Sequence, residues 1–404
     1  MTTPAISSTL LIPFHRAALG EEEIAEVVAT LRSGWLTTGP KTRQFEADFA
    51  AYVGIKHAVA VSSATAALHI ALEAIGLQAG ESVLVPTMTF AATAAVVRYF
   101  DAKPLLVDCR EEDFNMDYRH AHAVAQSAIL RGEKLRAILP VHFGGRVGDI
   151  AGLRKLAEKF SLTVIEDAAH CCPAYYREGT SQPWRSVGSE SAVSCFSFYA
   201  NKCITTGEGG MACTNDDQLA ARMRIMALHG ISKDAWKRFT AEGSWYYEIT
   251  APGFKYNLTD IAASIGLHQL KKANYFRDER GRVAEAYRRY LTTPLIQLPQ
   301  EDPLRINSWH LFVARLRLDS LMIDRAQVIQ ELKAAGIGTS VHWMPLHLHP
   351  YYREKYSLQP GDLPVSARLY PEIVSLPIYP SMTDGDVKLV SDLLTGILVR
   401  YAKP

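Results

Sequence analysis

The stretch Cys195-Phe-Ser-Phe-Tyr-Ala-Asn-Lys202-Cys-Ile-Thr-Thr-Gly-Glu-Gly-Gly210 places a lysine in a polar, glycine-closed turn directly after an apolar run. This pattern predicts that Lys202 lies just beyond the end of a buried strand. A lysine becomes a nucleophile when it is partly desolvated or perturbed by a neighbouring charge, and it can then form an imine with a carbonyl compound. Taken alone, Lys202 is better interpreted as an ordinary surface lysine. Two motifs upstream reverse that interpretation.

The first motif is Val164-Ile-Glu-Asp167-Ala-Ala-His170. Residues 163–165 are β-branched and predict a buried strand of a parallel sheet, with two carboxylates at its carboxyl end. Ligands of open α/β sheets bind beyond that end. Successive side chains of a strand point to opposite faces, so we expect Asp167 to face the ligand and Glu166 to point away. The alternative is that Asp167 only caps a following helix.

The second motif is the turn Ser62-Ser-Ala-Thr65, between a predicted strand at 58–61 and a predicted helix at 66–75. Such a turn presents backbone N–H groups and hydroxyls at the positive end of a helix, which favours a phosphate dianion. A small-residue turn is a weak signal by itself, because most such turns only cap a helix. The candidate phosphate-binding residues are Ser63, Ala64, Thr65 and, five residues before the lysine, Ser197.

A lysine, a carboxylate and a phosphate site are the groups that pyridoxal 5′-phosphate (PLP) needs. The lysine holds the cofactor as an imine, and the carboxylate pairs with the protonated pyridine nitrogen so that the ring can accept electrons. Phe90 follows the apolar run 83–85 and is the candidate for stacking on the pyridine ring, with an ordinary core aromatic as the alternative. The sequence therefore predicts a PLP site with Lys202 and Asp167 as its catalytic residues.

Seven blocks in one order extend this pattern over about residues 13–394. The blocks are Gly34-Trp-Leu-Thr-Thr-Gly-Pro40, Ser62-Ser-Ala-Thr65, Pro140-Val-His-Phe-Gly144, Glu166-Asp-Ala-Ala-His170, Ser197-Phe-Tyr-Ala-Asn-Lys202, Gly207-Glu-Gly-Gly210 and Gly253-Phe-Lys-Tyr-Asn-Leu-Thr-Asp260. On these blocks the chain resembles the DegT-type nucleotide-sugar aminotransferases, which are PLP enzymes of fold type I. Their spacing is most similar to members that aminate C4 of a UDP-linked 4-keto sugar, including the enzyme that makes UDP-4-amino-4-deoxy-L-arabinose.

The resemblance implies a role for each matching cofactor residue. Lys202 matches the Schiff-base lysine and Asp167 the partner of the pyridine nitrogen. His170 stands where many members carry a glutamine that bonds the phenolic oxygen of PLP, and imidazole can make a similar bond. Phe90 stands at the ring-stacking position, which is often Trp in close relatives. The positions that match phosphate contacts are Ala64, Thr65, Ser197 and Asn257.

Two further implications concern the substrate and a second subunit. Asn257 matches an asparagine that reaches the phosphate of the neighbouring subunit, so the resemblance implies a homodimer with active sites at its interface. Segments that contact the sugar or the nucleotide in similar enzymes match Thr37, Thr38, His342 and Trp343.

The function implied is transfer of the amino group of glutamate to a nucleotide-linked keto sugar, expected at C4 of a UDP-4-keto hexose or pentose, by a ping-pong mechanism. C3 amination, or a GDP- or dTDP-linked sugar, is the alternative within the family. One branch carries His in place of the lysine and removes a hydroxyl, and the presence of Lys202 favours transamination. A different PLP reaction, such as sugar dehydration or a lyase, also remains open. A non-catalytic regulator that binds PLP or a nucleotide sugar is disfavoured, because the chain shows no basic recognition helix.

The expected fold class is α/β. Apolar runs near residues 58, 83, 104, 137 and 163 alternate with helical patterns, which predicts a mainly parallel, doubly wound sheet. Fold type I implies seven strands in it and a smaller α+β domain. We expect a large PLP-binding domain at 1–257 with an amino-terminal arm, and a smaller domain at 258–404 that includes a bridging helix to residue 290. Within the smaller domain we expect strands at 309–316 and 338–341 and a helix at 324–335.

Composition limits the remaining classes. The 404 residues are 48% hydrophobic and carry a net charge of +1, so no overall field draws the chain to nucleic acid or membrane. The amino terminus lacks a signal-peptide pattern, so we expect a cytoplasmic enzyme that serves lipopolysaccharide or other glycan biosynthesis. The six cysteines are expected to be free, buried thiols. No carboxylate or Cys accompanies His342, His347 and His349, so we expect no metal site.

Overall fold

The apolar runs predicted as strands build a seven-stranded sheet in the computed structural model, which describes residues 11–231 and 247–404. The strand order is β1-β9-β8-β5-β4-β2-β3. Only β9 runs antiparallel to its neighbours, β1 and β8. The predicted α/β class and mainly parallel sheet are confirmed. The strands are β1 (His57–Val61), β2 (Glu81–Pro86), β3 (Lys103–Val107), β4 (Lys134–Ile138), β5 (Thr163–Asp167), β8 (Val193–Ser197) and β9 (Gly210–Thr214).

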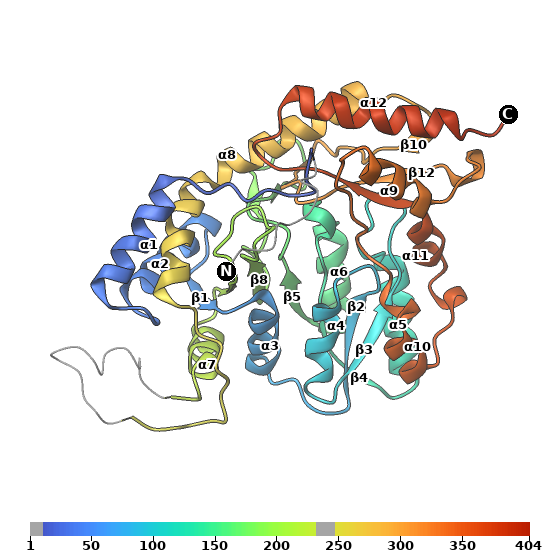
Figure 1. The fold of residues 1–404 in the computed structure, drawn as a ribbon. Coiled ribbons are helices and arrows are strands. Elements are labelled where there is room, and N and C mark those ends of the chain that lie inside the picture. Colours follow the sequence, from blue (N-terminus) through green and yellow to red (C-terminus); the bar gives the residue numbers. More distant parts are fainter. Residues whose placement is uncertain (1–10, 232–246) are drawn as a thin grey trace, which may run out of the picture.

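Helices cover both faces of this sheet (Figure 1). Alternate residues of one strand enter different cores: Val59 and Val61 pack into a cluster with helices α3, α4 and α7, whereas Ala58 and Ala60 pack into a cluster with α2 and α8. Helices α5 and α6 extend the second face. The helices are α1 (Glu21–Ser33), α2 (Pro40–Val53), α3 (Ala64–Ala74), α4 (Ala91–Arg98), α5 (Tyr118–Leu130), α6 (Ile150–Phe160), α7 (Asp217–Ala227) and α8 (Asp260–Tyr290).

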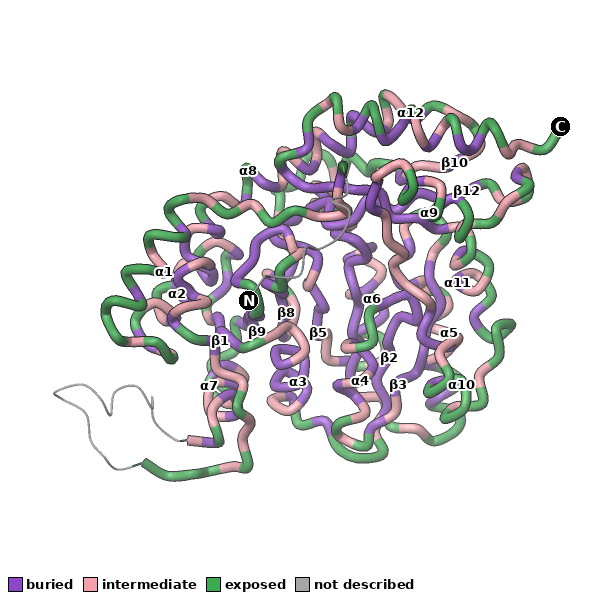
Figure 2. The backbone as a smooth tube through the Cα atoms, viewed as in Figure 1, coloured by how far each residue is buried: buried purple, intermediate pink, exposed green. Residues whose placement is uncertain are grey.

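Helix α8 leads from the large sheet to a second hydrophobic core. That core packs the carboxyl-terminal half of α8 and the carboxyl-terminal helices against a three-stranded antiparallel sheet of order β10-β12-β13. Figure 2 shows buried backbone through both cores. The elements of this region are β10 (Ile296–Gln297), β12 (Phe312–Leu316), α9 (Arg325–Ala334), α10 (Pro350–Tyr356), α11 (Pro364–Leu369), β13 (Ile373–Leu376) and α12 (Asp384–Arg400).

Two strand predictions in this region need correction. The strand expected at 309–316 begins only at Phe312, because Trp309 adopts a left-handed backbone with φ 49°. The segment 338–341 forms no strand, and Ser340 makes only an isolated bridge to Ser375. A third small sheet joins β6 (Tyr175–Tyr176), β7 (Arg185–Ser186) and β11 (Arg305–Ile306).

Three expectations about smaller features can be compared with the structure. All six cysteines are buried and unbridged, as predicted. Residues 1–10, which the expectation about a signal peptide concerns, lie outside the described residues. Within the ranges described, every helix is too short or too polar to cross a bilayer.

Candidate active site

A cavity of about 490 Å³ lies at the carboxyl edge of the large sheet. Asp167 ends β5 and Ser197 ends β8, while the turn at 62–65 follows β1 and Phe90 follows β2. Parallel strands present their carboxyl ends at one edge, so residues far apart in sequence meet there. The predicted residues that line this cavity are Ser63, Ala64, Thr65, Phe90, Asp167, His170, Ser197, Lys202, His342 and Trp343.

Three predicted residues do not line the cavity of their own chain. Thr37, Thr38 and Asn257 lie outside it, and Asn257 Nδ2 donates a 2.7 Å hydrogen bond to Thr38 Oγ1. Asn257 also bridges to Val61 at the end of β1. Thr38 and Asn257 therefore form a group of their own beside the turn at 62–65.

Lys202 is half-buried in the wall of the cavity. Burial lowers the pKa of its amine to about 8, against the opposing effects of Asp167 and Cys203. Desolvation disfavours the ammonium form, so about a tenth of the amine is unprotonated at pH 7 and about half at pH 8. This is the protonation state that a nucleophile or a general base requires.

Asp167 is buried at the end of β5, and two donors hold its carboxylate. Thr93 Oγ1 donates to Oδ2 at 2.8 Å, and the backbone N–H of Ala169 donates to Oδ1 at 3.2 Å. Burial raises the pKa of Asp167, and these hydrogen bonds together with Lys202 oppose the rise. A buried carboxylate of this kind gains most from a cation placed beside it.

Glu166 lies on the opposite side of β5 from the cavity, as strand alternation predicts. Its carboxylate accepts a hydrogen bond from Ser191 Oγ and lies 3.1 Å from His142 Nε2. Burial raises the pKa of Glu166, but the hydrogen bond and charge of His142, with Ser191, lower it below its ordinary value overall. Glu166 is thus a partner in a buried structural pair.

The turn at 62–65 leads into the amino terminus of α3. Ser63 is the N-cap, and its Oγ accepts from the N–H of Ala66 at 3.1 Å. The N–H groups of Ala64 and Thr65 stand at the start of the helix, where no intrahelical acceptor exists. A Cβ on Gly210 would lie 2.6 Å from the nitrogen of Ala64, so only glycine allows β9 to approach the turn this closely.

Several residues that line or support the cavity were not predicted. Tyr199 and Asn201 lie within the quoted lysine motif, so their proximity could have been inferred from it. Thr93 lies on the first turn of α4, and only its contact with Asp167 reveals it. His310 comes from the start of the carboxyl-terminal region, and only the tertiary fold brings it to the wall.

The histidines near the carboxyl terminus make separate hydrogen bonds. His342 Nδ1 lies 2.8 Å from Ser375 Oγ, and His347 Nδ1 lies 2.8 Å from Thr87 Oγ1. His349 Nε2 lies 3.2 Å from the carbonyl oxygen of Met344. Of the three, only His342 lines the cavity.

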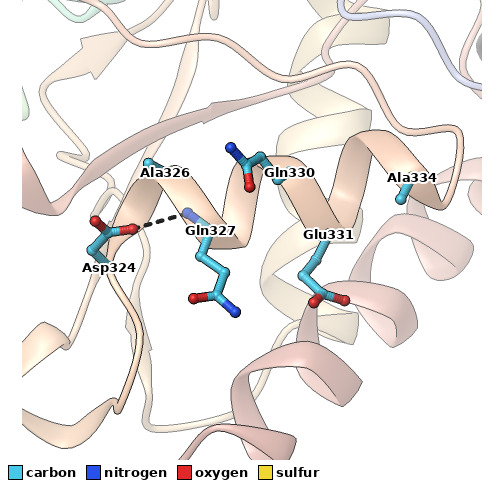
Figure 3. Close-up of a pocket in the computed structure, with 6 residues that line it drawn as sticks. All are labelled: Asp324, Ala326, Gln327, Gln330, Glu331 and Ala334. Carbon is cyan, nitrogen blue, oxygen red and sulfur yellow. Dashed lines mark hydrogen bonds between the residues drawn. The ribbon is translucent and has the colours of Figure 1, made fainter.

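A second hollow runs along α9 at the surface (Figure 3). None of the predicted site residues lines it. Asp324 Oδ1 accepts from the N–H of Gln327 at 2.9 Å, which is an ordinary N-cap. This hollow offers no chemistry comparable to the Lys202 cavity.

The residues of the Lys202 cavity fit PLP in their chemistry. The amine can bind an aldehyde, the carboxylate can pair with a pyridinium, and the helix start can hold a phosphate. Three polar atoms of lining residues are buried without a hydrogen-bond partner within the described structure: His170 Nδ1, Asn201 Oδ1 and His310 Nδ1. A polar ligand would give such atoms a polar environment.

Comparison with known proteins agrees with this chemistry. The model of the DegT/DnrJ/EryC1/StrS aminotransferase family matches residues 17–395. The chain belongs to this family. It is therefore a PLP-dependent aminotransferase, and its large sheet is that of PLP fold type I.

Individual relatives match nearly the whole chain. Spore coat polysaccharide biosynthesis protein SpsC of Bacillus subtilis is 40% identical over 96% of this chain and 97% of its own length. Uncharacterized protein MJ1066 of Methanocaldococcus jannaschii is 44% identical over 95% and 96% of the two chains. The PMP-form structure of putative sugar aminotransferase Spr1654 from Streptococcus pneumoniae superposes with a TM-score of 0.87 at 30% identity, over 96% and 99%.

Proposed function

We propose that this aminotransferase moves the amino group of glutamate to a nucleotide-linked keto sugar, at C4 of a UDP-4-keto hexose or pentose, in a ping-pong reaction. The observation that carries the proposal is a single cavity in which Lys202, Asp167 and His170 meet a wall of uncharged polar and aromatic side chains. Such a wall suits a sugar, because hydroxyl groups both donate and accept hydrogen bonds and the faces of sugar rings pack on aromatic rings.

The polar groups of the cavity are mostly uncharged. Among its described lining residues, only Asp167, Lys202 and Glu208 are acids or strong bases. Burial, with the charge of Lys202, lowers the pKa of His342 to about 4, so this imidazole is neutral at physiological pH. Neutral groups can hydrogen-bond to an uncharged sugar, which has no charge to pair with a charged side chain. His342 and Trp343 are our proposed sugar contacts.

Each proposed cofactor residue has a distinct task. PLP, when bound, supplies the electron sink that lets a proton leave Cα of the amino donor. Lys202 would hold the cofactor and, once freed by the amino donor, would take that proton as a general base and donate it again. Asp167 would pair with the protonated pyridine nitrogen, and His170 would bond the phenolic oxygen. Phe90 covers the ring, and the phosphate is bound by Ser63, Ala64, Thr65 and Ser197.

The names of relatives support a sugar product. SpsC is named for spore coat polysaccharide biosynthesis. PseC of Helicobacter pylori is described as an aminotransferase of pseudoaminic acid biosynthesis, and its structure superposes with a TM-score of 0.86 at 25% identity, over 96% of this chain and 100% of its own. We propose that the present enzyme likewise serves the biosynthesis of a glycan.

We also propose that a homodimer completes the site. Thr37, Thr38 and Asn257 lie outside the cavity of their own chain, which leaves them available to a second copy. Asn257 would contact the partner's cofactor phosphate, and the two threonines would contact the nucleotide. The hydrogen bond between Asn257 and Thr38 would then join the two functions in one group.

The decisive test follows the absorption spectrum of the PLP-loaded protein on addition of glutamate, with Lys202→Ala in parallel. We expect the visible band of PLP bound through the lysine to disappear as the amine form accumulates, and we expect no such band in the variant. Adding a UDP-4-keto sugar should restore the band and give an amino sugar, detected by mass spectrometry. A band that glutamate leaves unchanged would refute glutamate as donor; a band restored only by other keto sugars would refute the UDP-4-keto assignment.

A further inference from the structure

Two other rings stack on the imidazole of His170. His310 stacks on it with ring centroids 4.6 Å apart and an interplanar angle of 22°. Trp343 also stacks on it, at 5.0 Å and 11°. Both rings lie nearly parallel to the imidazole, so each packs flat against it. Two flat rings packed against the imidazole leave it little freedom to tilt.

The backbone of His170 is held by the segment that carries His310. Ser308 Oγ donates a hydrogen bond to the carbonyl oxygen of His170. The N–H of Ser308 donates to the carbonyl oxygen of Gly145 at 2.9 Å, and the N–H of Leu311 donates to the carbonyl oxygen of Gly144 at 3.0 Å. A Cβ on Gly145 would lie 2.9 Å from the nitrogen of His310, so a glycine is needed for this approach. Segment 307–311 thus fixes both the backbone and the ring of His170.

The conformation that presents His310 is strained. Trp309 has φ 49°, a left-handed value that is a true outlier for so bulky a residue. Arg280 is 1% exposed, and its Nη1 donates to the carbonyl oxygen of Trp309 at 3.3 Å and to that of Ile378 at 2.9 Å. Within residues 11–231 and 247–404, no carboxylate pairs with this buried guanidinium. Backbone strain and a buried unpaired charge both reduce stability, and such costs concentrate at functional sites.

We propose that His310 is a positioning residue of the amino-transfer site, which clamps the His170 ring against Trp343 so that His170 keeps one hydrogen-bonding direction toward the phenolic oxygen of PLP. The inference rests on the proposed function, because it takes the cofactor position from there. His310 acts through its ring face, which stacks on His170 at a centroid distance of 4.6 Å. Arg280 supports the position of His310 indirectly, because it donates a hydrogen bond to the carbonyl oxygen of the preceding residue, Trp309.

The test uses full-length, PLP-loaded protein and the pH midpoint of its visible absorption band. A hydrogen bond donated to the phenolic oxygen stabilises the anion there and lowers that midpoint. His310→Ala should raise the midpoint by about half to one pH unit. His310→Phe keeps a flat ring and should shift it much less. In a His170→Ala background, His310→Ala should add no shift of the midpoint. The effects of the two substitutions are not additive when one residue acts through the other.

The control is His69→Ala, which removes a buried histidine that packs on Phe254 at a centroid distance of 4.4 Å and does not line the cavity. It should lower Tm and leave the midpoint unchanged. If His310→Ala is too unstable to load, His310→Leu fills the space without a flat ring and gives the same comparison. Equal shifts in both backgrounds, or no shift at all, would overturn the positioning role while the glutamate response keeps the proposed function intact. A parent protein without the band would end both proposals.

Discussion

Thr93 Oγ1 donates a 2.8 Å hydrogen bond to Asp167 Oδ2, and this bond ties the first turn of α4 to the carboxyl end of β5. A hydroxyl has one proton, so the 2.8 Å contact between Thr93 and Thr89 is made with Thr89 as donor. The two threonines therefore form a short relay that ends on the carboxylate. Because the relay favours the charged carboxylate, Thr93 opposes the rise that burial causes in the pKa of Asp167.

Thr93→Val should weaken PLP binding by roughly tenfold, because Asp167 loses one hydrogen bond to its charged form. The shape of the side chain is nearly kept, so Tm should fall little. Equilibrium titration of the apo-protein with PLP measures the effect. Thr30→Val is the matched control, because it breaks a buried 2.6 Å bond to Ser264 outside the cavity. Equal PLP affinity in the two variants would contradict a role for Thr93.

Asp167→Asn should reduce the rate of amino transfer by about 100-fold or more, because an amide cannot balance a pyridinium charge. Single-turnover reaction with glutamate measures this step. Glu166→Gln is the matched control on the same strand, and it should lower stability while the reaction rate stays near that of the parent. If Glu166→Gln slowed amino transfer and Asp167→Asn did not, the assignment of Asp167 as the partner of the pyridine nitrogen would be wrong.

The rate at which apo-protein takes up PLP should rise with pH through about 8 and then level off. Burial lowers the pKa of Lys202 from 10.5 to about 8, so the reactive amine is nearly fully formed one unit above that value. Stopped-flow absorbance across a pH series measures the rate, with a free lysine derivative as the unperturbed reference. A rate that continued to rise toward pH 10.5 would show that Lys202 is not desolvated.

The His142–Glu166 pair should make stability sensitive to acid. The folded-state pKa of Glu166 lies below its ordinary value of 4.5, so the pair contributes stability above about pH 4.5 and loses it as pH falls through the folded-state pKa. Thermal unfolding from about pH 5 down to about pH 3 should therefore show a steeper decline in Tm for the parent than for Glu166→Gln. Parallel curves would mean that Glu166 titrates alike in folded and unfolded protein.

Asn257 offers a test of the proposed dimer. Lys202→Ala and Asn257→Ala should each have low aminotransferase activity alone. The first variant loses a residue of its own active site, and the second loses a residue of its partner's active site. Refolded together in equal amounts, they should recover about a quarter of the parent activity, because half of the dimers then hold one intact site. Recovery should be absent when either variant is refolded alone. No recovery in the mixture would mean that Asn257 serves its own chain.

The sequence alone determined much of the site, because local pattern sets where strands end. Lys202, Asp167 and the turn at 62–65 each follow an apolar run, and the carboxyl edge of a parallel sheet gathers such positions whatever the exact packing. The alternation of Glu166 and Asp167 needed only the two-residue period of a strand. Predictions of this kind depend on neighbours in sequence.

Only the tertiary structure decided the rest. His310 reaches His170 through the left-handed backbone at Trp309 and the close approach at Gly145, neither of which shows in the residues around His170. Thr93 meets Asp167 because α4 packs over the end of β5, and Asn257 stands outside its own cavity. Contacts between segments distant in sequence depend on how helices pack and where loops turn. The residue pattern of a single segment does not specify that geometry.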